Sequence, residues 1–298
     1  MHIRIVLNKD GGTLKTGDPD AITHKLSDAL KTAGHDISAA IPNGREIKSA
    51  LQSAAEDKSV DCIIVGGGDG SVSLAASLCL AYEKVLGVLP AGTMNFFARS
   101  LQVPLDLDSA IEALANAVVR PVDVGTVNGK VFVHQVSLGI QPRMVELRKS
   151  IPYASRFGKI FASVRAAIKA LTTPPSFRAT LTNGKDTHND RYSILAITNN
   201  VFGEGHLPYA DTLDDGILGI YSAQRLSFWM NVKLARDMLL GRWTDNEHLL
   251  SQSTDRVQIE VLSKTAGRKI SIDGELAPLE NVLDIRLHRR ALKVLMPS

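Results

Sequence analysis

Apolar runs alternate with stretches of helical periodicity over the first 125 residues of the chain. Runs of aliphatic residues bounded by glycine or polar residues predict strands at 3–7, 36–41, 60–65 and 85–89. Apolar residues that recur every three or four positions predict helices at 21–32, 46–55, 72–81 and 108–118. The run at 60–65 is almost wholly apolar, which is typical of a parallel strand covered on both faces. The pattern therefore predicts an open α/β layer sandwich with a parallel sheet.

The pattern changes after Pro121. Asn128-Gly129, a strong hairpin signal, joins apolar runs at 122–127 and 130–138. Further strand candidates follow at 176–181, 192–198, 219–221, 257–262, 269–272 and 282–286, interrupted by helical stretches at 156–171 and 227–241. We expect two domains, an α/β domain of residues 1–125 and a mostly antiparallel β domain of residues 126–290. The final run, 291–298, can pack on the first domain.

Composition limits the classes of protein to consider. Lysine and arginine number 34 against 31 acidic residues, so the charge balance gives no basis for binding nucleic acid. Cys62 and Cys79 lie in apolar runs and are expected to be buried thiols in a reducing compartment. We expect no transmembrane segment, because no apolar run approaches the ~20 residues that a membrane helix needs. The expected location is the cytoplasm, either free or peripheral on the inner face of the membrane.

A glycine-rich segment joins the strand at 60–65 to the helix after it. Glycines let the backbone approach a ligand closely, and a helix start presents free N–H groups, so phosphate is the expected ligand. A tight strand-to-helix turn would explain the glycines equally well. Asp69 favours the ligand site, because a carboxylate beside phosphate requires a cation such as Mg²⁺ between them. The segment consists of Gly66, Gly67, Gly68, Asp69, Gly70 and Ser71.

A second loop of similar chemistry follows the strand at 85–89. It contains Gly92, Thr93 and Asn95. Loops at the carboxyl ends of neighbouring parallel strands meet in one crevice, so both loops are expected to face the same ligand. Thr93 can offer a hydroxyl and a backbone N–H to phosphate, and it can also serve as a helix N-cap. The two loops together predict a site for a magnesium-bound nucleoside triphosphate.

These segments resemble the diacylglycerol kinase catalytic-domain family. The resemblance rests on Gly-Gly-Gly-Asp-Gly-Ser, on Pro-x-Gly-Thr-x-Asn, and on Arg99 in Phe-Ala-Arg. It implies a fold similar to NAD kinases and phosphofructokinases in the first domain. It also implies a lipid kinase that uses ATP and Mg²⁺ to phosphorylate the hydroxyl of a lipid such as diacylglycerol. The alcohol acceptor would come from a membrane surface.

The same resemblance implies roles for residues outside the two loops. Asn8 to Gly12 is similar to the family's first phosphate loop. Asp123 would join Asp69 in a Mg²⁺ network, and Glu275, in Asp-Gly-Glu, would be the general base. A structural Mg²⁺ would be held by Thr212, Asp215 and the carbonyl of Ile217. On turn chemistry alone, the Asp-Gly dipeptides in these last two segments are ordinary turns.

The chain departs from the family pattern at several positions. Phe96 stands where many members carry aspartate, which leaves Asp69 and Asp123 as the acids of the Mg²⁺ network. Asn8 is followed by Lys9, Asp10, Gly11 and Gly12, without the proline and serine of the family's first loop. Leu74 replaces the acidic or polar residue common just after the glycines.

Features that bear on the acceptor leave several interpretations open. The helical stretches at 156–171 and 227–241 carry apolar stripes with basic edges, which serve either as core faces, the commoner use, or as membrane contacts. No ligand spacing connects His134, His188 and His206, so we expect structural roles for them.

A soluble small-molecule kinase resembling NAD kinase, or a nucleotide-binding regulator without turnover, remains an alternative. The sequence does not fix the oligomeric state, and a homodimer is one option.

Overall fold

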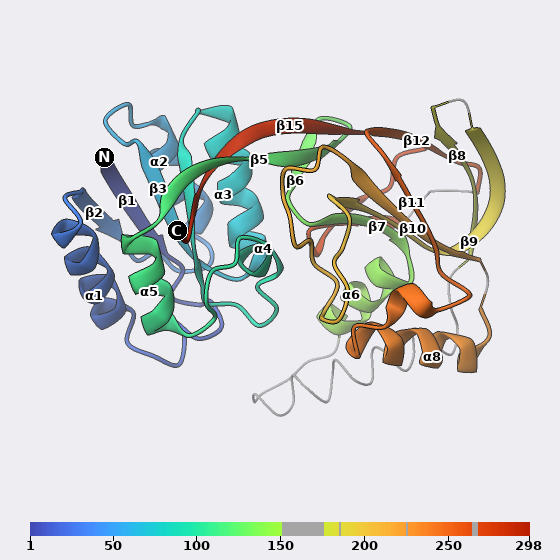
Figure 1. Cartoon of the computed structure of the whole chain (residues 1–298), viewed down its shortest axis with the longest axis horizontal. Helices are drawn as coiled ribbons and strands as arrows, with labels where there is room; N and C mark the ends of the chain where they lie inside the picture. The colour runs from blue at the N-terminus through green and yellow to red at the C-terminus, as the bar shows by residue number, and fades with distance from the viewer. Residues whose placement is uncertain (151–175, 185, 225, 264–267) are drawn as a thin grey trace.

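The computed structural model describes residues 1–150, 176–184, 186–224, 226–263 and 268–298, and its two lobes lie side by side (Figure 1). The first lobe contains β1 (His2–Leu7), α1 (Pro19–Thr32), β2 (Asp36–Ala40), α2 (Ile47–Glu56), β3 (Cys62–Gly67), α3 (Asp69–Ala81), β4 (Val85–Pro90), α4 (Phe96–Ser100) and α5 (Leu107–Ala115). Strands β2, β1, β3 and β4 pair in that order and are all parallel.

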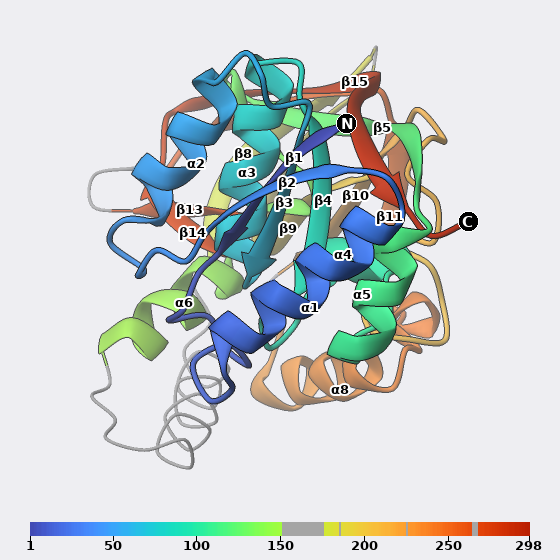
Figure 2. The same ribbon diagram turned by 90° about the vertical axis from the view of Figure 1, so that its left-hand side faces the viewer.

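Helices cover both faces of this parallel sheet. Helix α1 packs beside α5, and α2 packs beside α3 (Figure 2). Strands β3 and β4 are buried at every position, as the apolar runs predicted. Both cysteines are free and buried, also as predicted. The α/β layer sandwich is therefore confirmed.

The second lobe is built mainly from antiparallel strands. Its elements are β6 (Lys130–Phe132), β7 (Gln135–Gly139), α6 (Ile140–Ser150), β8 (Phe177–Asn183), β9 (Asp186–Asn199), β10 (Leu218–Gln224), α8 (Phe228–Leu239), the 3-10 helix η1 (Trp243–Asp245), β11 (Leu250–Thr254), β12 (Arg256–Val261), β13 (Lys269–Ile272) and β14 (Glu275–Pro278). Strand β9 pairs antiparallel with β7, β8 and β10. The predicted antiparallel character of this half is confirmed.

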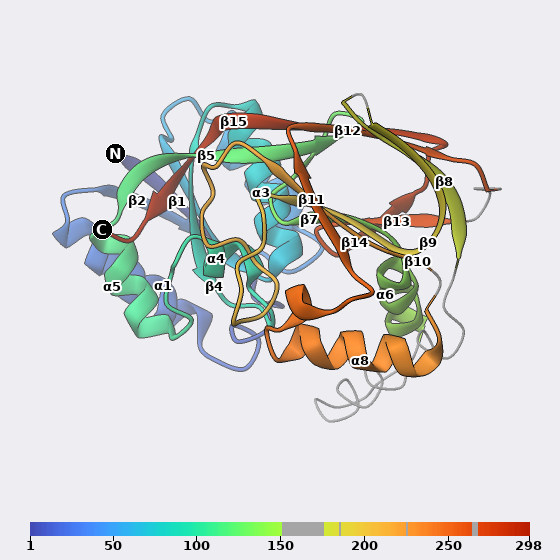
Figure 3. The ribbon, with the colours of Figure 1, turned by 45° about the vertical axis from the view of Figure 1, so that its right-hand side comes forward.

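Two long strands join the lobes. Strands β5 (Val118–Val127) and β15 (Val282–Met296) pair antiparallel and run along one side of both lobes (Figure 3). Strand β15 also pairs with β12 in the second lobe and, in parallel, with β4 in the first. The described strands thus form one 15-stranded sheet. The predicted domain limits, 125 and 290, fall inside these two strands, so the lobes are joined there by strand rather than by a linker.

Several local expectations changed in the structure. Asn128 and Gly129 have positive φ values of 47° and 78°, as a tight hairpin turn requires. The runs at 282–286 and 291–296 are one strand, with an irregular register between His288 and Leu292. The stretch 227–241 corresponds to α8, whereas 156–171 lies outside the described residues. Within the described part of the chain, no helix is long and apolar enough to cross a membrane.

Candidate active site

The glycine segment is shorter as a loop than its sequence indicated. Gly66 and Gly67 end β3, Gly68 caps α3, and α3 already begins at Asp69 instead of at position 72. A β-carbon on Gly66 would lie 2.4 Å from a methyl carbon of Leu7, so packing alone requires that glycine. A β-carbon on Gly68 would meet only the Cα of Gly92, at 3.7 Å. Gly68 is thus the glycine of the turn that faces the second loop.

The second loop is held closed by its own asparagine. The Asn95 side chain accepts from the Gly92 N–H at 2.8 Å and donates to the Gly92 carbonyl at 3.1 Å. Asn95, with a φ of 52°, occupies the N-cap position of α4 without a side-chain cap hydrogen bond, whereas the sequence had suggested Thr93 as the N-cap. Thr93 is exposed instead. A β-carbon on Gly92 would lie 2.7 Å from the Cα of Gly68, so the two loops touch through their backbones.

The loop at the start of the chain packs against both of these loops. The Asn8 N–H donates to the Gly66 carbonyl at 2.8 Å, and its side chain reaches the Ser71 hydroxyl at 3.3 Å. A β-carbon on Gly12 would lie 2.4 Å from the Ala91 carbonyl oxygen. Three loops therefore meet at the carboxyl ends of β1, β3 and β4. Their glycines and the start of α3 form a backbone-lined cradle that suits phosphate.

Asp69 connects two of these elements. Its carboxylate accepts hydrogen bonds from the Phe96 N–H at 2.8 Å and from the Asn95 N–H at 3.2 Å. It thereby joins the start of α3 to the start of α4. A carboxylate has about four lone-pair positions, so two such bonds leave it able to face a cation. The half-buried Asp69 therefore suits both a structural role and the predicted Mg²⁺ role.

Asp123 lies in a different environment from Asp69. It is fully buried, and its carboxylate oxygens accept from the Gly216 N–H at 2.7 Å and the Arg290 N–H at 2.8 Å. Its own N–H donates to the Leu213 carbonyl at 2.7 Å. The structure brings Asp123 together with the 212–217 loop and β15. Its membership of a Mg²⁺ network with Asp69 stays a prediction.

The 212–217 loop offers oxygen donors to a cation. The Thr212 hydroxyl donates to the Asp215 carboxylate, and both side chains are exposed. Arg289 donates to the Gly216 carbonyl at 3.2 Å, which holds the loop against β15. Hydroxyl, carboxylate and carbonyl oxygens suit Mg²⁺ or Ca²⁺. Among the described residues no three histidine, cysteine or acidic side chains gather as a metal cluster, so any cation here needs such mixed ligands and water.

The Asp-Gly-Glu segment is more than a turn. Asp273 has a φ of 46°, is buried, and accepts from three successive backbone N–H groups at 2.9 Å each, those of residues 133, 134 and 135. The Ser73 hydroxyl on α3 donates to the same carboxylate at 2.8 Å. Burial raises the pKa of Asp273, and these hydrogen bonds oppose the increase. Asp273 thus fastens the second lobe to α3.

Glu275 lies against the glycine turn from across the lobe boundary. A β-carbon on Gly70 would be 3.2 Å from Glu275 Oε1. The predicted base and the predicted phosphate turn, far apart in the sequence, are therefore neighbours. Sequence reasoning missed Ser73 and the anchoring role of Asp273. The available signal for Asp273 was its place in the Asp-Gly-Glu segment, two residues before Glu275. Nothing in the sequence around Ser73 indicated its contact with the second lobe.

Comparisons with known proteins agree with this fold. Residues 2–127 match the family described as "Diacylglycerol kinase catalytic domain". The diacylglycerol kinase of Bacillus subtilis (strain 168) is 28% identical over 246 residues, which cover 80% of this chain and 78% of that protein. A diacylglycerol kinase structure from Bacillus anthracis str. Sterne superposes with a TM-score of 0.72 at 19% identity, covering 100% of this chain and 97% of that one. A second structure from that organism gives 0.76 at 21%, covering 100% and 96%.

The fold and these relatives define a phosphotransferase of the kinase class. The resemblance to the diacylglycerol kinase catalytic-domain family is confirmed, because residues 2–127 match the model of that family. The two solved structures are similar in fold over the whole chain, so the second lobe shares the fold of those proteins as well.

Proposed function

We propose that this protein is an ATP- and Mg²⁺-dependent lipid kinase, which transfers the γ-phosphate of ATP to the hydroxyl of a lipid such as diacylglycerol. The observation that carries the proposal is the position of Glu275, whose Oε1 would lie 3.2 Å from a β-carbon on Gly70. A carboxylate from one lobe thus faces the phosphate-binding turn of the other. That arrangement suits transfer to an alcohol, which gains from a base that accepts the hydroxyl proton.

Each part of the cradle has a task in this reaction. The backbone N–H groups at the start of α3 and of the 92–95 loop would bind the phosphate oxygens. Asp69 would face the cation from the free side of its carboxylate. Bound Mg²⁺ would neutralise charge on the phosphates. Glu275 would take the proton of the acceptor hydroxyl as that oxygen attacks the γ-phosphorus, and the bond from that phosphorus to ADP would break so that ADP leaves. Catalysis otherwise consists of positioning and charge stabilisation.

The lipid nature of the acceptor is supported by the relatives, of which the Bacillus subtilis protein is named a diacylglycerol kinase. A lipid acceptor would require the protein to work at a membrane surface, and we propose the inner face of the cytoplasmic membrane. The 212–217 loop, with Thr212, Asp215 and the carbonyl of Ile217, would hold a second, structural Mg²⁺.

Labelled ATP, Mg²⁺ and a total lipid extract test the proposal, with the product identified by mass. Glu275→Gln should lower kcat by roughly 10²–10⁴-fold, the usual contribution of a general base. Its Kd for ATP should stay within about threefold, because the cradle is built from backbone.

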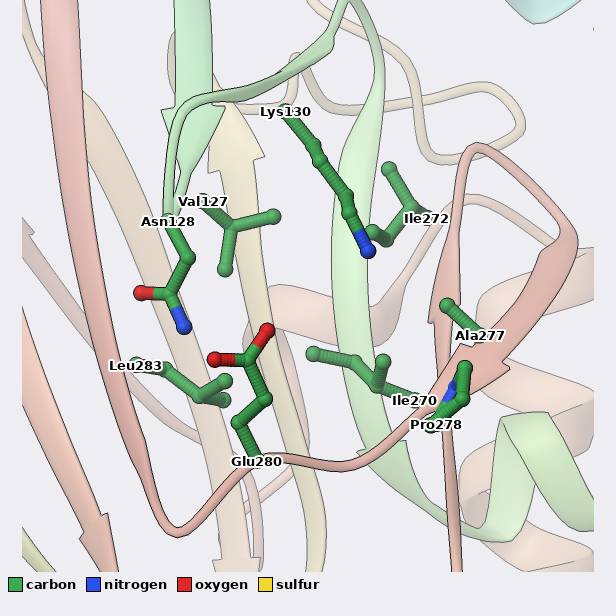
Figure 4. Close-up of a pocket in the computed structure, with 9 residues that line it drawn as sticks. All are labelled: Val127, Asn128, Lys130, Ile270, Ile272, Ala277, Pro278, Glu280 and Leu283. Carbon is green, nitrogen blue, oxygen red and sulfur yellow. The ribbon is translucent and has the colours of Figure 1, made fainter.

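Glu280→Gln is the matched control. Glu280 lies in the same part of the chain but lines a small pocket of about 10 Å³ with Lys130 and Leu283, on the side of the second lobe formed by β6 and β13 (Figure 4). It should keep wild-type turnover. Formation of NADP from NAD and ATP would replace the lipid proposal with a soluble kinase. Nucleotide binding without transfer to any lipid would indicate a regulator.

A further inference from the structure

A stack of aromatic rings crosses from the first lobe into the second. Phe96, the first residue of α4, stacks on His134 with ring centroids 4.3 Å apart and planes inclined by 7°. His134 stacks in turn on Phe202 at 5.1 Å, and Phe202 on Tyr221 at 5.4 Å. Trp243 meets Tyr221 edge-on at 5.0 Å. The phosphate-loop end of α4 is therefore continuous with the aromatic interior of the second lobe.

His134 takes part in this stack as a flat, neutral ring. Burial lowers its pKa to about 3, so the imidazole is uncharged at physiological pH. Its Nε2 has no hydrogen-bond partner among the described residues. The ring lies between two phenyl rings with nearly parallel planes. Its contacts are thus those of a small aromatic ring rather than those of an acid or a base.

The backbone of His134 belongs to the anchor made by Asp273. The His134 N–H donates to the Asp273 carboxylate, which also accepts from Ser73 on α3. Helix α3 begins with Asp69, whose carboxylate accepts from the Phe96 N–H. Asp69, Phe96, His134, Asp273 and Ser73 therefore form a closed circuit of contacts across the lobe boundary. The ring stack is the one link in this circuit that is not a hydrogen bond or the chain itself.

We propose that Phe96 and His134 are positioning residues, which hold the Gly92–Asn95 loop in register with Glu275. The inference rests on the proposed function. Phe96 follows that loop directly, and Glu275 follows the Asp273 anchor to which His134 is bound. The stack is therefore a second path of contacts between the loop and the base, in addition to the direct one through Asp69 and Gly70. One of its two residues, Phe96, occupies the position at which the family pattern led us to expect an aspartate.

The structure indicates which kinetic constant depends on the stack. The shape of the 92–95 loop is fixed by Asn95 and by the hydrogen bond from Phe96 N–H to Asp69, and neither needs the phenyl ring. Loss of the ring should leave ATP binding intact while the loop shifts relative to Glu275. A misplacement of about 1 Å can cost roughly 100-fold in rate. We therefore expect kcat to fall and the Kd for ATP to change little.

The experiment compares Phe96→Ala, His134→Ala, their combination and His134→Phe in the full-length protein. The measurements are kcat with the best lipid acceptor and the Kd for a non-hydrolysable ATP analogue by calorimetry. We expect the two alanine variants to lose roughly 10- to 100-fold in kcat, with Kd within about threefold. The double variant should be no slower than the slower single variant, because both remove the same contact. His134→Phe should restore kcat to within about threefold of wild type, since it keeps the stack.

Phe177→Ala is the control for general loss of packing. Phe177 is a buried aromatic residue of the second lobe that contacts Tyr192 and lies outside the circuit. It should lower the melting temperature without a selective loss of kcat. An equal loss in His134→Phe and His134→Ala would overturn the proposal, because the imidazole itself would then be needed. Wild-type kcat in Phe96→Ala would overturn it too. A wild-type protein that phosphorylates no lipid would instead refute the proposed function, and with it the positioning role.

Discussion

The buried imidazole of His134 makes a measurable prediction about acid stability. Its pKa in the folded protein is lowered to about 3, against 6.5 for an exposed histidine. Between these values the unfolded chain binds a proton that the folded protein does not bind. The stabilisation due to neutral His134 is therefore complete above pH 6.5 and is lost as the pH falls from 6.5 toward 3.

The size of the effect follows from one proton. Linkage gives about 1.4 kcal/mol per pH unit for a group that titrates only in the unfolded state. Lowering the pH from 8 to 5 should therefore cost the wild-type protein roughly 2 kcal/mol of unfolding free energy through His134 alone. His134→Phe keeps the stack between Phe96 and Phe202 and removes the titrating group. Its unfolding free energy should fall by about 2 kcal/mol less over the same interval.

Urea unfolding at pH 8, 7, 6 and 5, followed by circular dichroism, measures this difference. Other titrating groups are common to both proteins and cancel in the comparison. His188→Gln is the control variant, which removes an exposed histidine of β9 and leaves the stack intact. Parallel curves for wild type and His134→Phe would refute the assignment of a buried neutral imidazole. A curve for His134→Phe that falls more steeply than that of the wild type would refute it equally.

Three further predictions test other parts of the site. Gly92→Ala should weaken ATP binding by about tenfold in calorimetry, because overpacking of its β-carbon, 2.7 Å from the Gly68 Cα, must separate the loops; unchanged affinity would contradict their close contact. Asp273→Ala leaves three N–H groups, two of them in buried hydrogen bonds, without their acceptor and should cost roughly 3 kcal/mol or more in urea unfolding; a loss under about 1 kcal/mol would contradict the anchor. Mg²⁺ at about ten times its Kd should stabilise the wild type by roughly 1.4 kcal/mol. If the 212–217 loop binds the ion, Asp215→Ala should lose most of this stabilisation by Mg²⁺. Equal stabilisation of Asp215→Ala and the wild type would place the Mg²⁺ site elsewhere.

Local pattern was enough to find most of the first lobe. The apolar runs located β1, β2, β3 and β4 to within a few residues. The signal was clearest for β3 and β4, because strands buried on both faces differ sharply from their surroundings. The meeting of the two glycine-containing loops followed from topology, since the carboxyl ends of adjacent parallel strands lie at the same edge of the sheet. The contact between Gly68 and Gly92 has that origin.

Pairing between distant segments could not be predicted in the same way. The final run was expected to pack on the first domain, and Val294 of β15 does pair with β4. Nothing in the two apolar runs near the end of the chain showed that they form one strand, which also pairs with β5 and β12. A strand's own sequence shows which faces are buried but does not show which neighbour buries them. The division into lobes at 125 and 290 therefore cut through two strands.

The sequence alone determined the chemistry available to this protein: the glycine turns, Asp69 within them, and a carboxylate in Asp-Gly-Glu. The tertiary structure decided how those groups meet. Ser73 and Asp273 lie 200 positions apart and share a hydrogen bond, and Phe96 reaches His134 only because two lobes close on each other. The reason is physical: a periodic pattern reports the local environment of a residue. A contact across a lobe boundary depends instead on the path of every strand between its two partners.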